Sequence, residues 1–515
     1  MKNKGRLFEF LTLFAMVVGT VIGAGIYIKN KIILEATHNP IIAIILWLVV
    51  GIACVAVVYL FLEISSSTNK QGSGTISVWA QKFMNRKIGS FFSIFQTYVY
   101  APVMMSLFST AMIGFALKIA NFSLPGYVYW LIFLVGGIII ILLTTVLTVS
   151  SLSTSRRIIA IGTVLKFIPL VVSLISGFVI VAIFGIKDGT FGNGTPETWS
   201  IDSFEPLSFF RGFGGILFAF DGFVYICNSQ KRAKHKDVVP KALLFGMIFV
   251  SIFYVLMAIS LFLGSTDGSI AELLKRLFNG GQVKDSTAAN VLVAIITTLI
   301  CWLGIAGYSY ISVVGLESDL ADKVQVSEID NIQNEKVKIR KIAIKINIIT
   351  IIIHVIFTCA SAFSNISLKE TYESIVPTKS FDVGEQIANL IQVFSSACSC
   401  FSFAIMTSVI IAGLVNRKTN KVEVEKRKGF VVIGIISTIA IILFTSMGIF
   451  TFIVPDEVLY GNETWFNSGK GQGWLFILLS ILSIVFVSII WYIQEKQRIR
   501  MQVILNDSTT TRINK

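Results

Sequence analysis

The sequence has few of the residues from which metal sites, nucleotide sites and soluble cores are built. Only 14% of its 515 residues are charged and 54% are hydrophobic, which is not the composition of a soluble globular domain. The three histidines, His38, His235 and His354, are scattered along the chain. The six cysteines lie in or beside apolar segments without a metal-type spacing to histidine, so we expect no metal site. The sequence has no Walker-type phosphate loop and no hydrolytic constellation, which argues against an enzyme, a cofactor and direct use of ATP.

Long apolar runs dominate the chain instead. Many exceed the roughly 20 residues that a helix needs to cross a bilayer, and they are continuous rather than alternating, which excludes a β-barrel. We therefore predict an all-α polytopic membrane protein with about twelve transmembrane helices. The first run is long and has no clear cleavage site, so we interpret it as a span and not as a signal peptide. The expected spans are 9–29, 41–63, 88–117, 127–148, 158–185, 207–228, 240–263, 288–315, 342–364, 387–414, 430–454 and 473–493.

Positive charge is concentrated in alternate connections between these spans. The chain has 43 Lys and Arg against 29 Asp and Glu, a net charge of +14. With the N-terminus inside, the inner segments hold roughly 31 basic residues and the outer segments roughly 11, which is the bias of a membrane protein whose basic loops remain in the cytoplasm. We expect a multi-pass plasma-membrane protein, surrounded by lipid, with both termini cytoplasmic and no nucleic-acid partner.

Two of the apolar segments contain clusters of glycine. The first span holds GTVIGAGIY from Gly19 to Tyr27, and the sixth holds GFGGILFAFDGF from Gly212 to Phe223. Such glycines either let helices pack closely or mark a place where the helix breaks. Free backbone groups inside a membrane are tolerated only where they are buried in protein or line a cavity. Interrupted spans in matching positions of two halves indicate a substrate site where the halves meet.

These segments resemble the amino acid–polyamine–organocation superfamily of permeases. VIGAGIY, residues 21–27, is similar to the first-helix motif of that superfamily, and FAFDGF, residues 218–223, is similar to its sixth-helix motif. The resemblance covers nearly the whole chain and implies a leucine-transporter-like fold. In that fold two inverted five-helix repeats, at about 9–185 and 207–414, are followed by two extra helices at about 430–493, with cytoplasmic ends at 1–8 and 494–515. Further matches in the same order are Trp47, Gly51, Glu63, Gly72-Ser73-Gly74, Gly89 and Pro240.

The resemblance also implies where a substrate binds. The amino group would meet carbonyls near Phe218, Ala219 and Phe220. Exposed N–H groups at a half-helix N-terminus favour an anion, and free carbonyls favour an ammonium. The sequence departs from the superfamily at Val224, where an acidic residue is common. The substrate carboxylate would meet unwound backbone at Ile22, Gly23, Ala24, Gly25 and Ile26.

Two ionisable residues lie deep in apolar segments, where a charge is costly and therefore indicates function. Lys166 lies nine residues from Arg157 in the fifth span, roughly 14 Å along a helix and too deep for snorkelling. Some members of the superfamily place a fifth-helix lysine where sodium binds in relatives, and the resemblance implies this coupling role for Lys166. The alternative is a structural lysine bound to carbonyls at the first-helix break. Asp221 is either a counter-charge or proton site, or the N-cap of an inner half-helix. The two residues are also candidates to pair with each other.

Other polar residues are expected to have structural or solvated roles. Glu63, at the inner end of the second span, is expected to be solvated. The connection 319–341 is expected to be a solvated connector or a short surface helix, and the polar end 495–515 to be disordered. Tenth-span serines are expected to serve close helix packing, and four tyrosines are expected to pack, with a possible place in the pocket wall. These are Ser395, Ser396, Ser399 and Ser402, and Tyr98, Tyr100, Tyr308 and Tyr310.

The expected function is that of a secondary transporter that moves an amino acid by alternating access. Proton symport and exchange are both open as the drive, and the oligomeric state and the identity of the amino acid are open too. One alternative is an exchanger of cationic amino acids or polyamines, with Asp221 binding the extra charge. Another is a non-transporting membrane receptor for amino acids, which would be expected to have a signalling domain that the sequence does not show.

Overall fold

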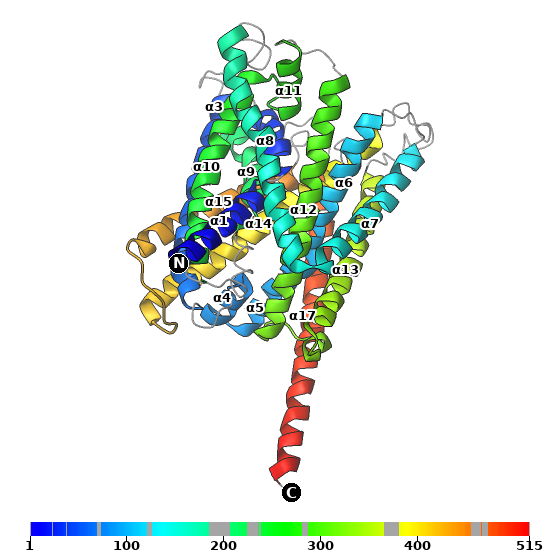
Figure 1. The fold of residues 1–515 in the computed structure, drawn as a ribbon. Helices are drawn as coiled ribbons and strands as arrows, with labels where there is room; N and C mark the ends of the chain where they lie inside the picture. Colours follow the sequence, from blue (N-terminus) through cyan, green and yellow to red (C-terminus); the bar gives the residue numbers. More distant parts are fainter. Residues whose placement is uncertain are drawn as a thin grey trace.

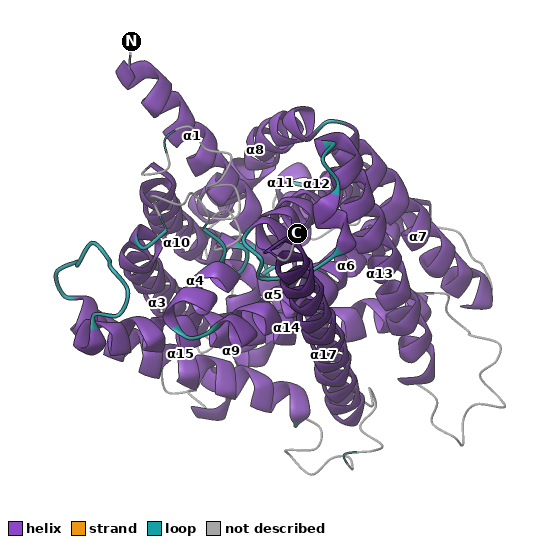
Figure 2. Cartoon of the chain, turned by 90° about the horizontal axis from the view of Figure 1, so that it is seen from below, coloured by secondary structure: helices purple, strands orange, loops and turns teal. Residues whose placement is uncertain are grey.

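The structure, a computed structural model, describes residues 2–22, 24–37, 39–68, 74–120, 126–184, 206–223, 238–280, 287–364, 381–454 and 472–513, with His235 and Trp465. Within these residues every regular element is a helix and no strand occurs (Figure 2). The helices form one bundle, from which the end of the last helix protrudes (Figure 1). The predicted all-α class is confirmed.

The helices follow the predicted apolar runs. The third span is continuous through α5, η1 and α6, and η1 is a single π-helical turn within it. The elements are α1 Lys2–Val21, α2 Ala24–Thr37, α3 Pro40–Ser66, α4 Ile76–Phe83, α5 Arg86–Phe95, η1 Gln96–Tyr100, α6 Ala101–Ala120, α7 Gly126–Ser150, α8 Leu152–Phe184, α9 Pro206–Phe220, α10 Val238–Gly264, α11 Ile270–Phe278, α12 Thr287–Ala321, η5 Glu328–Asn331, α13 Glu335–Ser364, α14 Phe381–Thr419, α15 Phe430–Ile453 and α17 Gln472–Ile513.

Ten helices in the described part of the chain are long and apolar enough to cross a membrane. The two remaining expected spans are those with glycine clusters, and both are interrupted. The first is divided into α1 and α2, and the helix of the sixth, α9, ends at Phe220. These two together with the ten account for the twelve spans that the sequence predicts.

Spans five positions apart in the chain pack against each other. The helix α3 packs on α10, α6 on α12, α7 on α13, and α2 on α9. An odd number of spans in a repeat reverses the direction of the next repeat, so such partners run in opposite directions. This pairing is the arrangement expected where two inverted five-span repeats meet.

The side chains separate an apolar outer surface from a packed interior. Large apolar side chains such as Leu147 of α7, Val164 of α8 and Ile439 of α15 are more than half exposed. A surface of this kind suits contact with lipid rather than water. In the interior, Trp47 and Tyr254 are fully buried. The two interrupted spans lie in this interior, where α2 and α9 contact α3 and α1 contacts α10.

The polar C-terminal end is helical rather than disordered. The helix α17 continues without interruption to Ile513 and extends out of the bundle (Figure 1). Residues 494–513 contain neither proline nor glycine. Residues 494–513 continue a helix that has already formed in the membrane segment, so they do not pay the free-energy cost of starting a new helix. The prediction of disorder, which rested on polarity alone, was wrong for this segment.

Two carboxylates expected at the solvated inner end are buried instead. Glu63 is 2% exposed and binds Arg417 of α14 at 2.7 Å, so its counter-charge comes from a distant part of the chain. Asp319 lies within α12, is 3% exposed, and accepts hydrogen bonds from Thr75 at 2.8 Å and from Ser93. The connector therefore begins after Ala321, and its short helix is the 3-10 helix η5.

Candidate functional site

The first span is interrupted at its glycine cluster. The helix α1 ends at Val21 and α2 begins at Ala24, while Gly23 lies outside the described residues. The N–H of Ile22 still reaches the Val18 carbonyl at 2.8 Å, so the α1 ladder closes there. The first N–H groups of α2 then have no partner within their own helix. The start of α2 therefore presents backbone donors in the middle of the bundle.

The second interruption begins directly after Phe220. The Asp221 N–H turns back to the Phe218 carbonyl at 3.2 Å, and Gly222 has φ +96°, a left-handed conformation that suits glycine. Residues 224–234 lie outside the described part of the chain. The departure at Val224 and the interpretation of Asp221 as the N-cap of an inner half-helix therefore concern a segment that is not described.

The two interruptions lie against each other. A Cβ on Gly25 of α2 would lie 2.9 Å from the Cα of Ala219 on α9, so the two backbones nearly touch. The Tyr254 hydroxyl of α10 lies within hydrogen-bond distance of two carbonyl oxygens, that of Val21 at 2.8 Å and that of Ala219 at 3.0 Å, which share its one proton. One side chain thus spans the end of α1 and the end of α9. No motif in the sequence of the seventh span distinguishes this tyrosine.

Asp221 is surrounded by hydroxyl groups. Its carboxylate accepts a hydrogen bond from Tyr100 at 2.6 Å and one from the Gly222 N–H at 2.7 Å. Ser399 and Ser402 of α14 lie beside the same carboxylate. Tyr100 is the last residue of the π-helical turn η1, and an extra residue in a helical turn shifts the direction of the side chains after it. Tyr100, Ser399 and Ser402 were expected to pack, but they also surround the buried carboxylate of Asp221.

Lys166 lies at the first interruption, on α8. Its side chain is 5% exposed and its ammonium donates to the Gly19 carbonyl, in the last turns of α1. A Cβ on Gly19 would lie 2.0 Å from the Thr163 hydroxyl, so the glycine lets α1 and α8 approach closely. Among the described side chains Lys166 and Asp221 do not form an ion pair, and each has the partners given above. Their suggested pairing is therefore absent.

Lys29 is a buried cation that the sequence pattern does not single out. It lies on α2, is 3% exposed, and donates to the Ser396 hydroxyl of α14 at 2.9 Å. Its ammonium also lies 4.7 Å from the centre of the Phe218 ring on α9. Ser396, expected to serve only helix packing, is thus a partner of a charge. Lys29 stands at the expected end of the first span, where a lysine ordinarily reaches water.

Most of the candidate binding residues meet in one place. Ile22 is buried directly after α1, and Gly25 and Ile26 are buried in the first turn of α2. Phe218 to Phe220 are buried at the end of α9, and Asp221 is buried directly after it. The backbone of Ala24 begins α2, and Gly23 is not described. The Phe220 ring faces Trp47 and Tyr254, with centroids 5.9 and 5.0 Å away, so it belongs to an aromatic cluster with α3 and α10.

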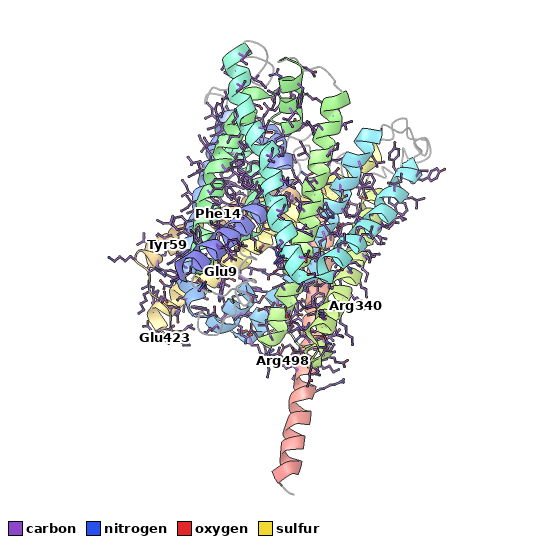
Figure 3. All side chains as sticks on the ribbon, viewed as in Figure 1. Glu9, Phe14, Tyr59, Arg340, Glu423 and Arg498 are labelled. Carbon is purple, nitrogen blue, oxygen red and sulfur yellow. The ribbon has the colours of Figure 1, made fainter. Side chains whose placement is uncertain are left out.

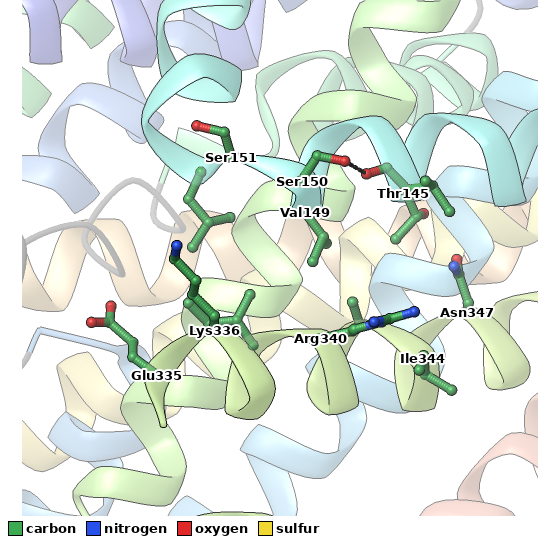
Figure 4. A pocket seen from close by; sticks show the side chains of 13 residues that line it. Thr145, Val149, Ser150, Ser151, Glu335, Lys336, Arg340, Ile344 and Asn347 are labelled. Carbon is green, nitrogen blue, oxygen red and sulfur yellow. Dashed lines mark hydrogen bonds between the residues drawn. The ribbon is translucent and has the colours of Figure 1, made fainter. Parts of the chain in front are cut away.

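A large cavity lies away from the two interruptions, and the described residues show no metal-binding cluster. The described residues contain no group of three or more His, Cys, Asp or Glu able to hold a metal ion. A cavity of about 790 Å³ lies between α7, α8 and α13, lined by Ser151, Lys336, Arg340 and Asn347 among others (Figure 4). None of the candidate binding residues lines it.

Comparison with known proteins shows to which family the sequence belongs. The family described as amino acid permease matches residues 8–479. The chain belongs to the amino acid permease family. An uncharacterized protein of Mycoplasma pneumoniae is similar to the permease, with 25% identity over 89% of this chain and 88% of that one. The serine/threonine exchanger SteT of Bacillus subtilis is 24% identical over 56% of the permease and 61% of its own length.

The match confirms the predicted superfamily and class of the permease. It is a multi-pass helical membrane protein of a family of amino acid permeases. Both interruptions lie inside the matched residues, the first between the end of α1 at Val21 and the start of α2 at Ala24, and the second after Phe220. Within the two motifs, Ile22 and Asp221 lie where the helices are interrupted, whereas Phe218 to Phe220 are still in α9. Ala24 to Ile26 already belong to α2, so the expectation of unwound backbone at these three residues was wrong.

Proposed function

We propose that the permease is a secondary active transporter that moves an amino acid across the plasma membrane by alternating access, with both of its termini in the cytoplasm. The observation that carries this proposal is the contact between the start of α2 and the end of α9, where Gly25 meets Ala219. Unpaired N–H groups and the positive end of the α2 dipole suit a carboxylate. Carbonyls at the end of α9 suit an ammonium. A zwitterionic amino acid supplies both groups at once.

The binding residues follow from this arrangement. The substrate carboxylate is assigned to the backbone of Ile22 to Ile26, and the amino group to the carbonyl side of Phe218 to Phe220. Asp221 stands next to the amino group and adds negative charge. Because Tyr100 and the Gly222 N–H already bind its carboxylate, Asp221 is poorly placed to bind a cationic side chain as well. This argues against the cationic amino acid or polyamine alternative.

The drive that we propose is exchange of one amino acid for another. The name of the Bacillus subtilis relative supports this choice, since that protein is a serine/threonine exchanger. The Lys166 ammonium at the Gly19 carbonyl supplies a positive charge next to the first interruption. In this proposal Lys166 takes the place of a sodium ion, and the empty carrier reorients slowly because no substrate carboxylate and ammonium pair with the polar groups of the site.

Flux through purified protein in proteoliposomes tests the proposal. Vesicles loaded with a mixture of amino acids are expected to accumulate a labelled amino acid, whereas empty vesicles are not. Lys166→Gln is expected to abolish this accumulation while the protein remains folded by size-exclusion chromatography. If an acidic exterior drives accumulation in empty vesicles, proton symport replaces exchange. If no amino acid is taken up under any condition, the transport proposal is wrong and a receptor role gains support.

A further inference from the structure

Lys29 lies next to the proposed substrate site. It follows Gly25 by four residues on α2, so the two residues share one helix face. Side chains on a helix lean toward its N-terminus, and the stem of Lys29 therefore points back toward Gly25. The position of Phe218 confirms that the Lys29 side chain lies close to Gly25. Its ring borders both positions, with its Cδ1 3.6 Å from a Cβ placed on Gly25 and its centre 4.7 Å from the Lys29 ammonium.

The charge of Lys29 has no counter-ion among the described side chains. Its partners are a serine hydroxyl and the face of an aromatic ring, and no described carboxylate lies within 4.0 Å of the ammonium. Taking an ammonium out of water is costly, and a hydroxyl and an aromatic ring compensate for only part of that cost. An incoming anion would supply the counter-charge that this buried position lacks.

The balance of charge around the interruptions points in the same direction. Lys29 and Lys166 place two cations beside the start of α2, and the N-terminal end of that helix is itself positive. The carboxylate of Asp221 is bound by Tyr100 and by its own neighbour Gly222. A zwitterion with a neutral side chain would use the helix end but would leave Lys29 unmatched. A cationic side chain there would meet a like charge.

We propose that the substrate is a dicarboxylic amino acid and that Lys29 is the counter-ion of its side-chain carboxylate. This proposal rests on the proposed transport function, because it names the substrate class of the same site. The α-carboxylate binds the first N–H groups of α2, and the second carboxylate takes the place of the Ser396 hydroxyl at the Lys29 ammonium. Lys29 is then the residue that sets specificity, whereas the backbone binds the part common to all amino acids.

Matched substrate pairs test this without altering the protein. Aspartate and asparagine differ little except in side-chain charge, and so do glutamate and glutamine. In counterflow into loaded proteoliposomes, wild type is expected to take up each acid at least about tenfold better than its amide, since the amide leaves a buried charge unpaired. Equal uptake, or preference for the amides, overturns the assignment of substrate class. Failure to take up any amino acid instead overturns the transport function itself.

Two variants separate specificity from folding. Lys29→Gln is expected to reverse the preference toward the amides, because it can hydrogen-bond an amide but cannot neutralise an acid. Lys29→Arg keeps the charge and is expected to keep the preference for acids. Thermal-shift measurements in detergent with the same four compounds show whether each variant is folded and which compound stabilises it. An equal loss of all four substrates in both variants, with folding intact, means that Lys29 only joins α2 to α9 and α14.

Discussion

At the scale of single residues, the Tyr254 hydroxyl touches both interrupted helices. It binds the Val21 carbonyl at 2.8 Å and the Ala219 carbonyl at 3.0 Å, and the residue is fully buried. Both carbonyls belong to helix ends, where the next turn cannot satisfy them. A buried polar group without a partner costs free energy, so this single hydroxyl stabilises both ends in their present positions.

Tyr254→Phe removes that hydroxyl and leaves the ring in place. Losing a donor to a buried carbonyl costs about 1–3 kcal/mol, and we expect a lower unfolding midpoint together with weaker amino acid uptake. The unfolding midpoint is measured by thermal shift in detergent and uptake by counterflow. Tyr492→Phe is the control, since that side chain is 63% exposed and its hydroxyl is not needed inside the bundle. If the two variants behave alike, Tyr254 does not support the interruptions.

The two buried lysines show how far the sequence reaches at this scale. Lys166 was predictable because it lies well inside an apolar run, and the structure places its ammonium on a carbonyl of the first span. Lys29 was missed because it stands at the expected end of a span, where lysines reach water. Its burial depends on Phe218 of α9 and Ser396 of α14, which are 189 and 367 residues away in the chain. A local pattern cannot contain that information.

At the scale of elements, the close contact between α2 and α9 depends on Gly25. A methyl group there would lie 2.9 Å from the Ala219 Cα, which is backbone and cannot turn aside. The glycine clusters were enough to predict where both spans are interrupted. They were not enough to predict the partner of each glycine, because Gly19 packs on α8 and Gly25 on α9. Both explanations of the clusters, close packing and interruption, therefore hold in the same segment.

Gly25→Val should force α2 and α9 apart. Overpacking costs about 1–3 kcal/mol, and we expect uptake to fall about five- to hundredfold while the protein still reaches the membrane. Gly307→Val on α12 is the matched control, because nothing lies within 4 Å of a Cβ at that position. Immunoblotting of membranes and counterflow give the two quantities. Wild-type uptake by Gly25→Val would remove the contact from the proposed site.

The π-helical turn η1 shows an element that the sequence does not reveal. The segment QTYVY has no proline and no glycine, and its apolar neighbours predict ordinary helix. The π-helical turn places the Tyr100 hydroxyl within hydrogen-bond distance of Asp221, directly after α9, and of Tyr308 on α12. These contacts stabilise the turn. Such a turn depends on partners from distant spans, as the burial of Lys29 does.

At the scale of the whole molecule, charged groups join distant segments at one end of the bundle. Glu63 binds Arg417 at 2.7 Å, and Arg86 binds Glu495 at 2.6 Å. Arg498 donates to the carbonyls of Lys323 and Val324. Figure 3 shows Arg340, Glu423 and Arg498 at this lower end. Because the positive-inside bias predicts that this end faces the cytoplasm, the joined segments would form the inner face of the transporter.

Thiol labelling of intact cells tests that orientation. The proposed orientation places Lys418, at the end of α14, on the cytoplasmic side of the membrane and Lys31, on α2, on the outer side. The Lys31 ammonium lies 3.5 Å from the Asp267 carboxylate, just before α11. In a background without native cysteines, Lys31→Cys is expected to react with a membrane-impermeant maleimide, whereas Lys418→Cys is expected to stay unlabelled. Neither change should harm folding, since exposed ion pairs contribute about 0–1 kcal/mol.

A permeant maleimide serves as the control, because it should label both variants and so show that each cysteine is reactive. If the impermeant reagent labels Lys418→Cys and spares Lys31→Cys, the molecule lies the other way round. The basic residues at the lower end would then face outward, against the charge bias. An inverted molecule would keep its binding site, since the interruptions lie between the two ends. Only the direction from which each gate opens would change, so this labelling separates the orientation from the site.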